Sequence, residues 1–250
     1  LLDEYQRLGY FLADIRRDDI SVPRVFLSQL PKDLPTVQSV PKRKSLFIRS
    51  LLPLVLRANE EILADRARIE MLRDRIVAGQ ALTPTDAAWL DGLSASYGLV
   101  PRDLAGLLHR HDQVPVGLAL AQGIEESGWG TSRFALHGNA VFGQWTFSKG
   151  AGLVPLERED VARHEVKAFP TLTDSVRQYI RNLNNHRAYR EFRKERAALR
   201  RNSKPIDSIA LAKTMTRYSQ RGAHYVIDSI ADLIPCLDDI EARLKRGEKP

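Results

Sequence analysis

Apolar residues recur at helical spacing through most of the chain. Between residues 45 and 77, Val55, Ile62, Ile69 and Ile76 return every seven residues, with Leu72 on a neighbouring row. That spacing predicts a long helix with one apolar face, which Gly79 ends as a cap. The face can pack on the protein's own core, or it can bind a partner or a second copy of the chain.

Shorter helices are expected before and after a central apolar segment. Residues 116–126 are apolar on most sides, so this helix should be buried. Thr83 and Pro84 open a helix that runs to about Tyr97, with proline at its first position. The same periodicity predicts further helices at 101–109, 173–185, 189–200, 206–216 and 225–245.

Two segments depart from helical spacing. Residues 152–172 alternate apolar and polar positions around a charged turn, which predicts a β-hairpin. Residues 1–44 contain four prolines, so we expect a short helix at 3–16 followed by an extended arm. The predicted fold class is mainly α (α+β), with a small β-hairpin lobe.

Composition narrows the classes of function. The 250 residues are 43% hydrophobic, a proportion typical of globular domains, and no apolar run approaches the ~20 residues of a membrane-spanning helix. The single Cys236 excludes an intrachain disulfide and a cysteine-based metal cage. A formal net charge of +7 favours an anionic partner: nucleic acid, a membrane face or a cell-wall polymer.

The segment 125–130, Glu-Glu-Ser-Gly-Trp-Gly, carries the strongest candidate chemistry. It places Glu125 and Glu126 at the C-terminal end of the buried helix, where the helix dipole disfavours negative charge. A carboxyl there keeps its proton more readily, as a general acid must. The alternative is a solvated helix end with Trp129 packed on a turn.

Residues 121–130, Ala-Gln-Gly-Ile-Glu-Glu-Ser-Gly-Trp-Gly, followed by Asn-Ala-Val-Phe-Gly at 139–143, resemble the signature of the bacterial glucosaminidase domain. This family has a lysozyme-like fold and cleaves peptidoglycan. Further matches point to its Bax-like branch. They lie at 53–59, 152–155, 164–169, 182–189 and 221–225, so the resemblance covers about residues 40–240.

The resemblance implies roles for individual residues. Glu126, directly before Ser-Gly-Trp-Gly, takes the place of the catalytic acid, and Tyr225 that of the cleft tyrosine. Ala140 replaces the second asparagine of the family pattern, which removes one amide contact to the substrate. The residues expected to bind the sugar chain are Asn139, Phe142 and Gly143 in the groove floor, and Trp129 and Trp145 as stacking surfaces.

The second carboxylate is expected on the hairpin. Glu165 is favoured because it lies in the matched His-Glu-Val stretch, with Glu157 as the runner-up. An inverting mechanism needs the two carboxyl groups roughly 6.5–9.5 Å apart, whereas a substrate-assisted route uses the sugar's own N-acetyl oxygen.

Three functions are compatible with the resemblance. The first is an endo-β-N-acetylglucosaminidase that cleaves the GlcNAc–MurNAc bond, and the second is a lytic transglycosylase of the same architecture. The third is a non-catalytic glycan-binding or scaffold protein, with the helix at 45–77 recruiting another envelope protein. The substrate implies a periplasmic or envelope location.

The expected organisation is an extended arm (1–44), a helical extension (45–95) and a lysozyme-like catalytic domain (96–245). No cofactor or metal is expected, because the histidines show no ligand spacing. Nucleic acid is disfavoured as a partner, since Glu191 and Glu195 interrupt the arginine-rich helices.

Overall fold

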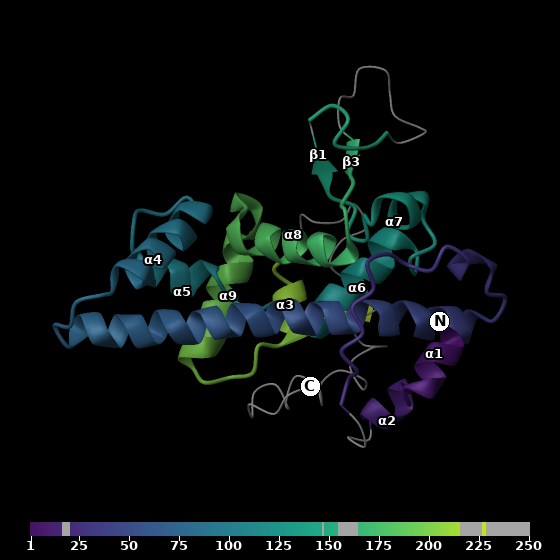
Figure 1. The fold of residues 1–250 in the computed structure, drawn as a ribbon, viewed down its shortest axis with the longest axis horizontal. Helices are drawn as coiled ribbons and strands as arrows, with labels where there is room; N and C mark the ends of the chain where they lie inside the picture. The colour runs from purple at the N-terminus through teal and green to yellow at the C-terminus, as the bar shows by residue number, and fades with distance from the viewer. Residues whose placement is uncertain (17–20, 147, 155–164, 216–226, 229–250) are drawn as a thin grey trace.

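The computed structural model describes residues 1–16, 21–146, 148–154, 165–215 and 227–228. Most of these residues are helical, and one small antiparallel sheet stands at the side of the helical body (Figure 1). The mainly α fold class with a small β lobe is therefore confirmed. The longer helices are α3 (Val40–Val77), α4 (Pro84–Ser96), α6 (Val116–Ser127), α8 (Leu172–Asn185) and α9 (Arg190–Arg201).

Helix α3 runs across the whole molecule (Figure 1). It begins five residues before the predicted start and contains Pro53 in its interior. The predicted apolar row is buried at Val55 and Ile69, but Ile76 near the C-terminal end is exposed. Buried positions of α3 thus continue as far as Leu72, while Ile76 and Val77 at its end are exposed.

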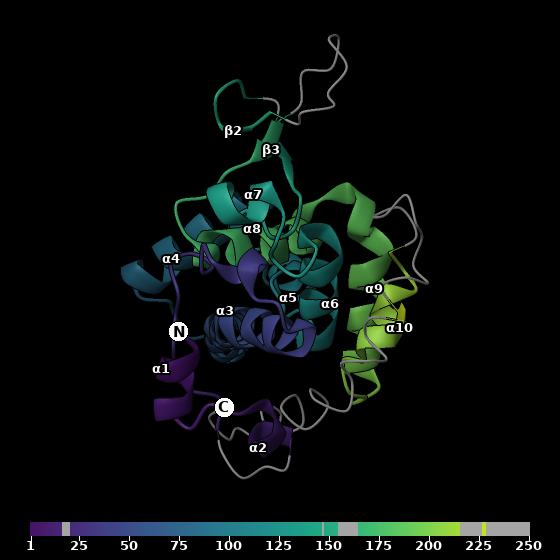
Figure 2. The same cartoon turned by 90° about the vertical axis from the view of Figure 1, so that its right-hand side faces the viewer.

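Helices α6 and α8 pack against α3 to form the main core. Figure 2 views α3 nearly end-on, with α5 (Leu104–Arg110), α6 and α8 beside it. Ten of the twelve residues of α6, namely Val116 to Ile124 and Ser127, are buried, as the apolar pattern predicted. A second cluster joins the C-terminal part of α3 to α4 and α5 through Ile69, Leu90 and Leu107.

Cap residues set the ends of several helices. Thr83 accepts a hydrogen bond from the backbone N–H of Asp86, which starts α4 at the predicted position. Thr171 and Asp174 form a reciprocal capping box at the start of α8. These local signals explain why the predicted helices begin within a few residues of the observed ones.

The N-terminal arm has more regular structure than we predicted. The single helix expected at 3–16 is two short helices, α1 (Leu2–Arg7) and α2 (Leu12–Arg16). A 3-10 turn, η1 (Leu34–Thr36), follows the extended stretch. Tyr5, Leu30 and Leu34 are buried in the main core, so the arm is part of the packed body.

The sheet contains the predicted hairpin and one further strand. Strands β2 (Gly152–Leu153) and β3 (Glu165–Lys167) pair antiparallel, with Gly152 opposite Lys167. Strand β1 (Trp145–Thr146), which we did not predict, pairs with the other edge of β3 to give the order β1-β3-β2. This lobe follows α7 (Arg133–Gly138), also unpredicted, and precedes α8.

The C-terminal helices are shorter than predicted where they are described. A 3-10 turn, η2 (Arg187–Tyr189), leads into α9, and α10 covers Ser208–Ala212 rather than 206–216. The helix predicted at 225–245 falls almost entirely outside the described residues. Among the helices that are described, none combines the length and the apolar composition that a membrane crossing requires.

All three predicted segments contribute to one core. Its buried members include Tyr5 from the arm, Leu51 from α3 and Phe192 from α9. The boundaries proposed at residues 44/45 and 95/96 stay predictions.

Candidate functional site

Glu126 lies at the C-terminal end of α6, where the sequence placed it. The helix ends at Gly128, which adopts a left-handed conformation with φ 57°. Burial raises the pKa of the Glu126 carboxyl, and the negative charge of Glu125 raises it further. The residue as a whole is still exposed, so the carboxyl can reach a ligand. This combination suits a group that must hold a proton and deliver it.

Gly143 leaves the space that this carboxyl occupies. A Cβ atom built on Gly143 would lie 2.7 Å from Oε2 of Glu126, closer than such contacts normally allow. Gly143 also has φ +58°, a conformation that side chains other than hydrogen disfavour. The glycine of the Phe-Gly pair in the signature thus lies directly against the Glu126 carboxyl.

Phe142 supports this position from within the core. Its ring stacks on that of Tyr179 from α8, with 4.0 Å between centroids and 9° between planes. Both rings are buried, and the hydroxyl of Tyr179 donates a hydrogen bond to Oε1 of Gln122 on α6. Phe142 therefore packs on α8, and Tyr179 links α8 to α6. Because Phe142 is only 1% exposed, its contact with a sugar stays a prediction.

The turn after Glu126 is held by Ser127. Its buried hydroxyl donates to the carbonyl of Gly123 at 2.5 Å and accepts from the backbone N–H of Gly130 at 2.8 Å. Gly130 has φ +76°, and a Cβ there would come within 2.8 Å of Phe47 on α3 and Leu30 in the arm. The Ser-Gly-Trp-Gly motif thus packs tightly against the N-terminal part of the chain.

Trp129 makes its described contacts with α3. Its ring meets Phe47 edge-on with centroids 6.1 Å apart, and Nζ of Lys44 lies 4.5 Å from its centroid. The ring is partly buried, and its backbone has φ +59°. Stacking of Trp129 on a sugar stays a prediction, and the structure gives this ring a packing role.

Asn139 is tied to the segment after the sheet. Its amide group donates to the carbonyl of Phe169 at 3.0 Å and to that of Pro170 at 3.3 Å. Its Oδ1 atom is buried and has no hydrogen-bond partner within the described part of the chain. The contacts fix the end of α7 against the sheet lobe, and its role in sugar binding stays a prediction.

Of the two hairpin candidates for a second carboxylate, the structure describes only Glu165. Glu165 lies on β3 and is only 6% exposed. Its carboxylate accepts hydrogen bonds from the backbone N–H groups of Gly150, at 3.1 Å, and Gly152, at 3.0 Å. Those bonds anchor the loop between β1 and β2. Glu157 lies outside the described residues, as does Tyr225, the predicted cleft tyrosine.

Trp145 on β1 has the exposure that a stacking surface needs. Its side chain is 63% exposed, while its backbone pairs with Val166. Aromatic side chains that project from a small sheet offer a flat apolar face to a ligand. The prediction that Trp145 contacts sugar is compatible with this placement.

Tyr189 belongs to the site, although the sequence marked it only as a matched position. Burial is the main cause that raises the pKa of its hydroxyl, and the negative charge of Glu126 raises it further. A hydrogen bond with Asn182 acts in the opposite direction. The charge of Glu126 thus acts on Tyr189, although burial is the larger cause. Its aromatic type within the matched stretch 182–189 was the only signal for it.

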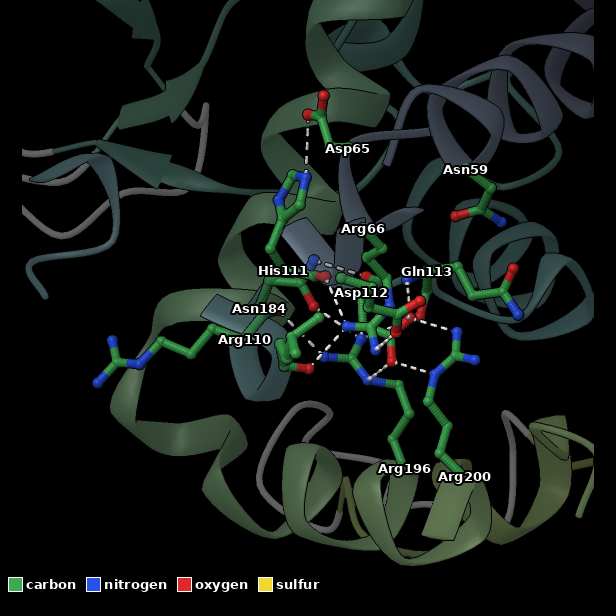
Figure 3. Close-up of polar contacts among 12 residues, drawn as sticks. Asn59, Asp65, Arg66, Arg110, His111, Asp112, Gln113, Asn184, Arg196 and Arg200 are labelled. Atoms are coloured by element: carbon green, nitrogen blue, oxygen red, sulfur yellow. Dashed lines mark hydrogen bonds and ion pairs between the residues drawn. The ribbon is translucent and has the colours of Figure 1, made fainter. Parts of the chain in front are cut away.

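Other matched positions hold the helices together. The amide of Asn59 on α3 donates to the carbonyl of Val114 at 2.7 Å and accepts from its N–H at 3.1 Å. Asn184 on α8 donates to the carbonyl of Asp112 at 2.7 Å and accepts from Arg196 at 2.7 Å (Figure 3). These asparagines satisfy buried backbone groups in the segment that leads into α6.

A metal-dependent site has no support in the described part of the chain. No group of three or more His, Cys, Asp or Glu side chains is placed there so that it could hold an ion.

Comparison with known proteins agrees with the geometry. The Glucosaminidase family model, described as mannosyl-glycoprotein endo-beta-N-acetylglucosaminidase, matches residues 103–229, slightly more than half of the chain. That match includes α6, the turn after it and the sheet lobe. Protein bax of Escherichia coli (strain K12) is 30% identical over 206 residues, which make up 79% of this chain and 71% of that protein.

Two further matches are short. The phosphonoacetaldehyde hydrolases of Paraburkholderia phytofirmans and Paraburkholderia xenovorans are 76% identical over 29 residues, only 12% of this chain and 11% of each relative. No solved structure matches the chain significantly. The family match and the long alignment with Protein bax decide the assignment: the chain belongs to the Bax-like branch of the glucosaminidase family.

Proposed function

We propose that the protein is a peptidoglycan hydrolase, an endo-β-N-acetylglucosaminidase that cleaves the GlcNAc–MurNAc bond with Glu126 as general acid. The observation that carries the proposal is the environment of Glu126: an exposed residue at the end of a buried helix, with the pKa of its carboxyl raised by burial and by Glu125. A protonated carboxyl so placed can donate to the leaving oxygen of a glycosidic bond.

The surrounding residues keep the acid in position. Gly143 leaves room for the carboxyl, and the Ser127 hydrogen bonds fix the turn that follows it. The pKa of the Tyr189 hydroxyl in η2 is raised by burial and by the charge of Glu126, so it remains a hydrogen-bond donor throughout the neutral range. Trp145 is proposed to stack on a sugar ring, since its side chain is exposed on the β lobe.

A mechanism with a single essential carboxyl also fits the geometry. The carboxylate of Glu165, the favoured base, already accepts hydrogen bonds from two backbone amides. A carboxylate that holds a loop in this way is less available to orient an attacking water. This observation favours a substrate-assisted route, in which the sugar's N-acetyl oxygen attacks the anomeric carbon. It equally favours the second candidate function, a lytic transglycosylase, which needs only Glu126.

The products separate the two enzymes. Purified peptidoglycan is incubated with the protein, and mass spectrometry identifies the sugar at each new end. Reducing GlcNAc ends support the glucosaminidase, and anhydromuramic ends support the transglycosylase. Glycan binding without any new ends would overturn both and leave a glycan-binding scaffold protein.

Location and partners follow from this proposal. A peptidoglycan substrate implies the periplasm or the cell envelope, and the net charge of +7 suits an anionic wall. We propose that an envelope partner would meet the last turns of α3, because Met71 and Val77 are 51% and 82% exposed there. The earlier part of α3 is covered by the protein's own helices.

A further inference from the structure

An open groove with a volume of about 690 Å³ lies between α3, α5, α9 and the loop after α9. Its lining is strongly basic. The cationic residues are Arg66, Arg73, Arg200, Arg201 and Lys204. Glu70 is the one acidic side chain among the described residues that line it.

More positive charge lies behind the groove wall. Arg66, Arg196 and Arg200 converge on the single carboxylate of Asp112 (Figure 3). The shortest distance to a carboxylate oxygen of Asp112 is 3.5 Å from Arg66, 3.7 Å from Arg196 and 2.5 Å from Arg200. Burial lowers the pKa of Arg196 to about 10, and the charges of Arg66 and Arg200 act in the same direction against the attraction of Asp112. Three guanidinium groups thus share one carboxylate.

Backbone carbonyl groups hold two of these arginines rigidly. Arg66 donates to the carbonyls of Leu108 and His111, at 2.6 and 3.0 Å. Arg196 donates to the carbonyls of Arg110 and Gln113, at 3.2 and 2.9 Å. These bonds satisfy backbone carbonyl groups at the C-terminal end of α5, but they do not cancel the full positive charge of each arginine. The wall of the groove is therefore both fixed and positive.

The outer part of the groove carries cations that have no ion-pair partner among the described residues. Arg201 and Lys204 are exposed, and neither has an acidic partner within the described part of the chain. Arg200 uses two of its nitrogens on Asp112 and is still 34% exposed. Even with Asp112 and Asp74 counted, which pair with Arg200 and Arg73, the described cations of this groove outnumber the carboxylates by five to three.

We propose that this groove binds a phosphate-type oxyanion, held by Arg200, Arg201 and Lys204 at its mouth. A phosphate group offers several oxygens and up to two negative charges, so it matches several cations that line one groove better than a single carboxylate does. The same group occurs on free phosphorylated compounds and on lipid headgroups.

This anion groove is separate from the candidate active site. Gln113, which lines it, precedes α6, whereas Glu126 lies at the other end of that helix. The 12 residues of α6 span about 18 Å. Binding in the groove therefore does not depend on the proposed acid, and Glu126→Gln should leave it unchanged.

Isothermal titration calorimetry with inorganic pyrophosphate at constant ionic strength tests the proposal on the full chain. The double variant Arg201→Ala/Lys204→Ala should bind about tenfold more weakly, because two charge-assisted contacts are lost. The matched control Lys32→Ala/Lys213→Ala removes the same charge at exposed positions outside the groove and should bind as the wild type does. A thermal unfolding curve for each variant verifies that it is folded.

Two results would overturn the proposal. One is no pyrophosphate binding by the folded wild type at millimolar concentration. The other is an equal loss of affinity in the control, which would show attraction by net charge alone. Sedimentation with vesicles distinguishes a lipid headgroup from a free phosphate compound as the source of the anion. Vesicles of phosphatidylglycerol with phosphatidylcholine are compared with vesicles of phosphatidylcholine alone. Sedimentation that is lost in Arg201→Ala/Lys204→Ala assigns a lipid headgroup, whereas pyrophosphate binding without such sedimentation assigns a free phosphate compound.

Discussion

Replacing Gly143 by alanine should impair catalysis more than it impairs folding. The new Cβ would stand 2.7 Å from Oε2 of Glu126, whereas ordinary contacts begin at 3.4 Å, so the carboxyl must move by at least about 0.7 Å. The carboxyl is the free end of a flexible side chain, so rotation relieves the contact at little cost in stability. A catalytic group displaced by about 1 Å can lose on the order of 100-fold in rate.

The backbone strain of this substitution can be measured separately. Gly143 has φ +58°, and alanine in that conformation costs about 1–2 kcal/mol. Gly79 has φ +74°, and a Cβ atom added there would have no neighbour within 4 Å. Gly79→Ala therefore introduces the same kind of backbone strain as Gly143→Ala but makes no close contact with another side chain. Both variants should lose similar free energies of unfolding in urea titrations.

The two variants should differ in turnover on peptidoglycan. Gly79→Ala should keep the wild-type rate when assayed well below its unfolding temperature, and Gly143→Ala should be slower by roughly 10- to 100-fold. If Gly143→Ala is as active as Gly79→Ala, the placement of Glu126 over Gly143 does not position the acid. The reasoning about this pair would then be wrong.

Three further predictions concern charged groups. The substitution Glu125→Gln removes a negative charge and should lower the pKa of Glu126, so the alkaline limb of the pH–rate profile should move to lower pH. An unmoved limb would contradict the assignment of the charge of Glu125 as a cause of the raised pKa. Asp112→Asn leaves Arg196 buried without its carboxylate and should cost about 3–5 kcal/mol in urea unfolding, against under 1 kcal/mol for a surface pair. Burial lowers the pKa of His111 below its ordinary 6.5, so the unfolded chain binds the proton more tightly than the folded chain does. The free energy of unfolding should therefore fall as the pH drops through about 6.5. The urea midpoints measured at pH 5 and pH 7.5 should differ less in His111→Asn than in the wild type.

The long helices of the fold could be predicted from local sequence signals. The apolar periodicity of α3 and the apolar surface of α6 identify both helices because each extends over several turns. Strand β1 has two residues and α7 has six, which is too short for periodicity to show. The alternating stretch predicted the hairpin, but not its third strand, since pairing across a sheet is a tertiary contact.

The candidate site was predictable only in part. Glu126 could be singled out because a motif marks the end of a buried helix; the raised pKa of its carboxyl comes from burial and from the charge of Glu125. The neighbours of Trp129 could not be foreseen, because Lys44 and Phe47 come from a helix more than eighty residues earlier. The hydrogen bonds of Glu165 depend in the same way on the fold of a loop.

The most direct test of the account compares peptidoglycan cleavage by the wild type and by Glu126→Gln. The amide keeps the size of the side chain but cannot donate an acidic proton, so the rate of new glycan ends should fall by at least about 100-fold while glycan binding and the unfolding midpoint are retained. Cleavage by folded Glu126→Gln at close to the wild-type rate would contradict the central claim.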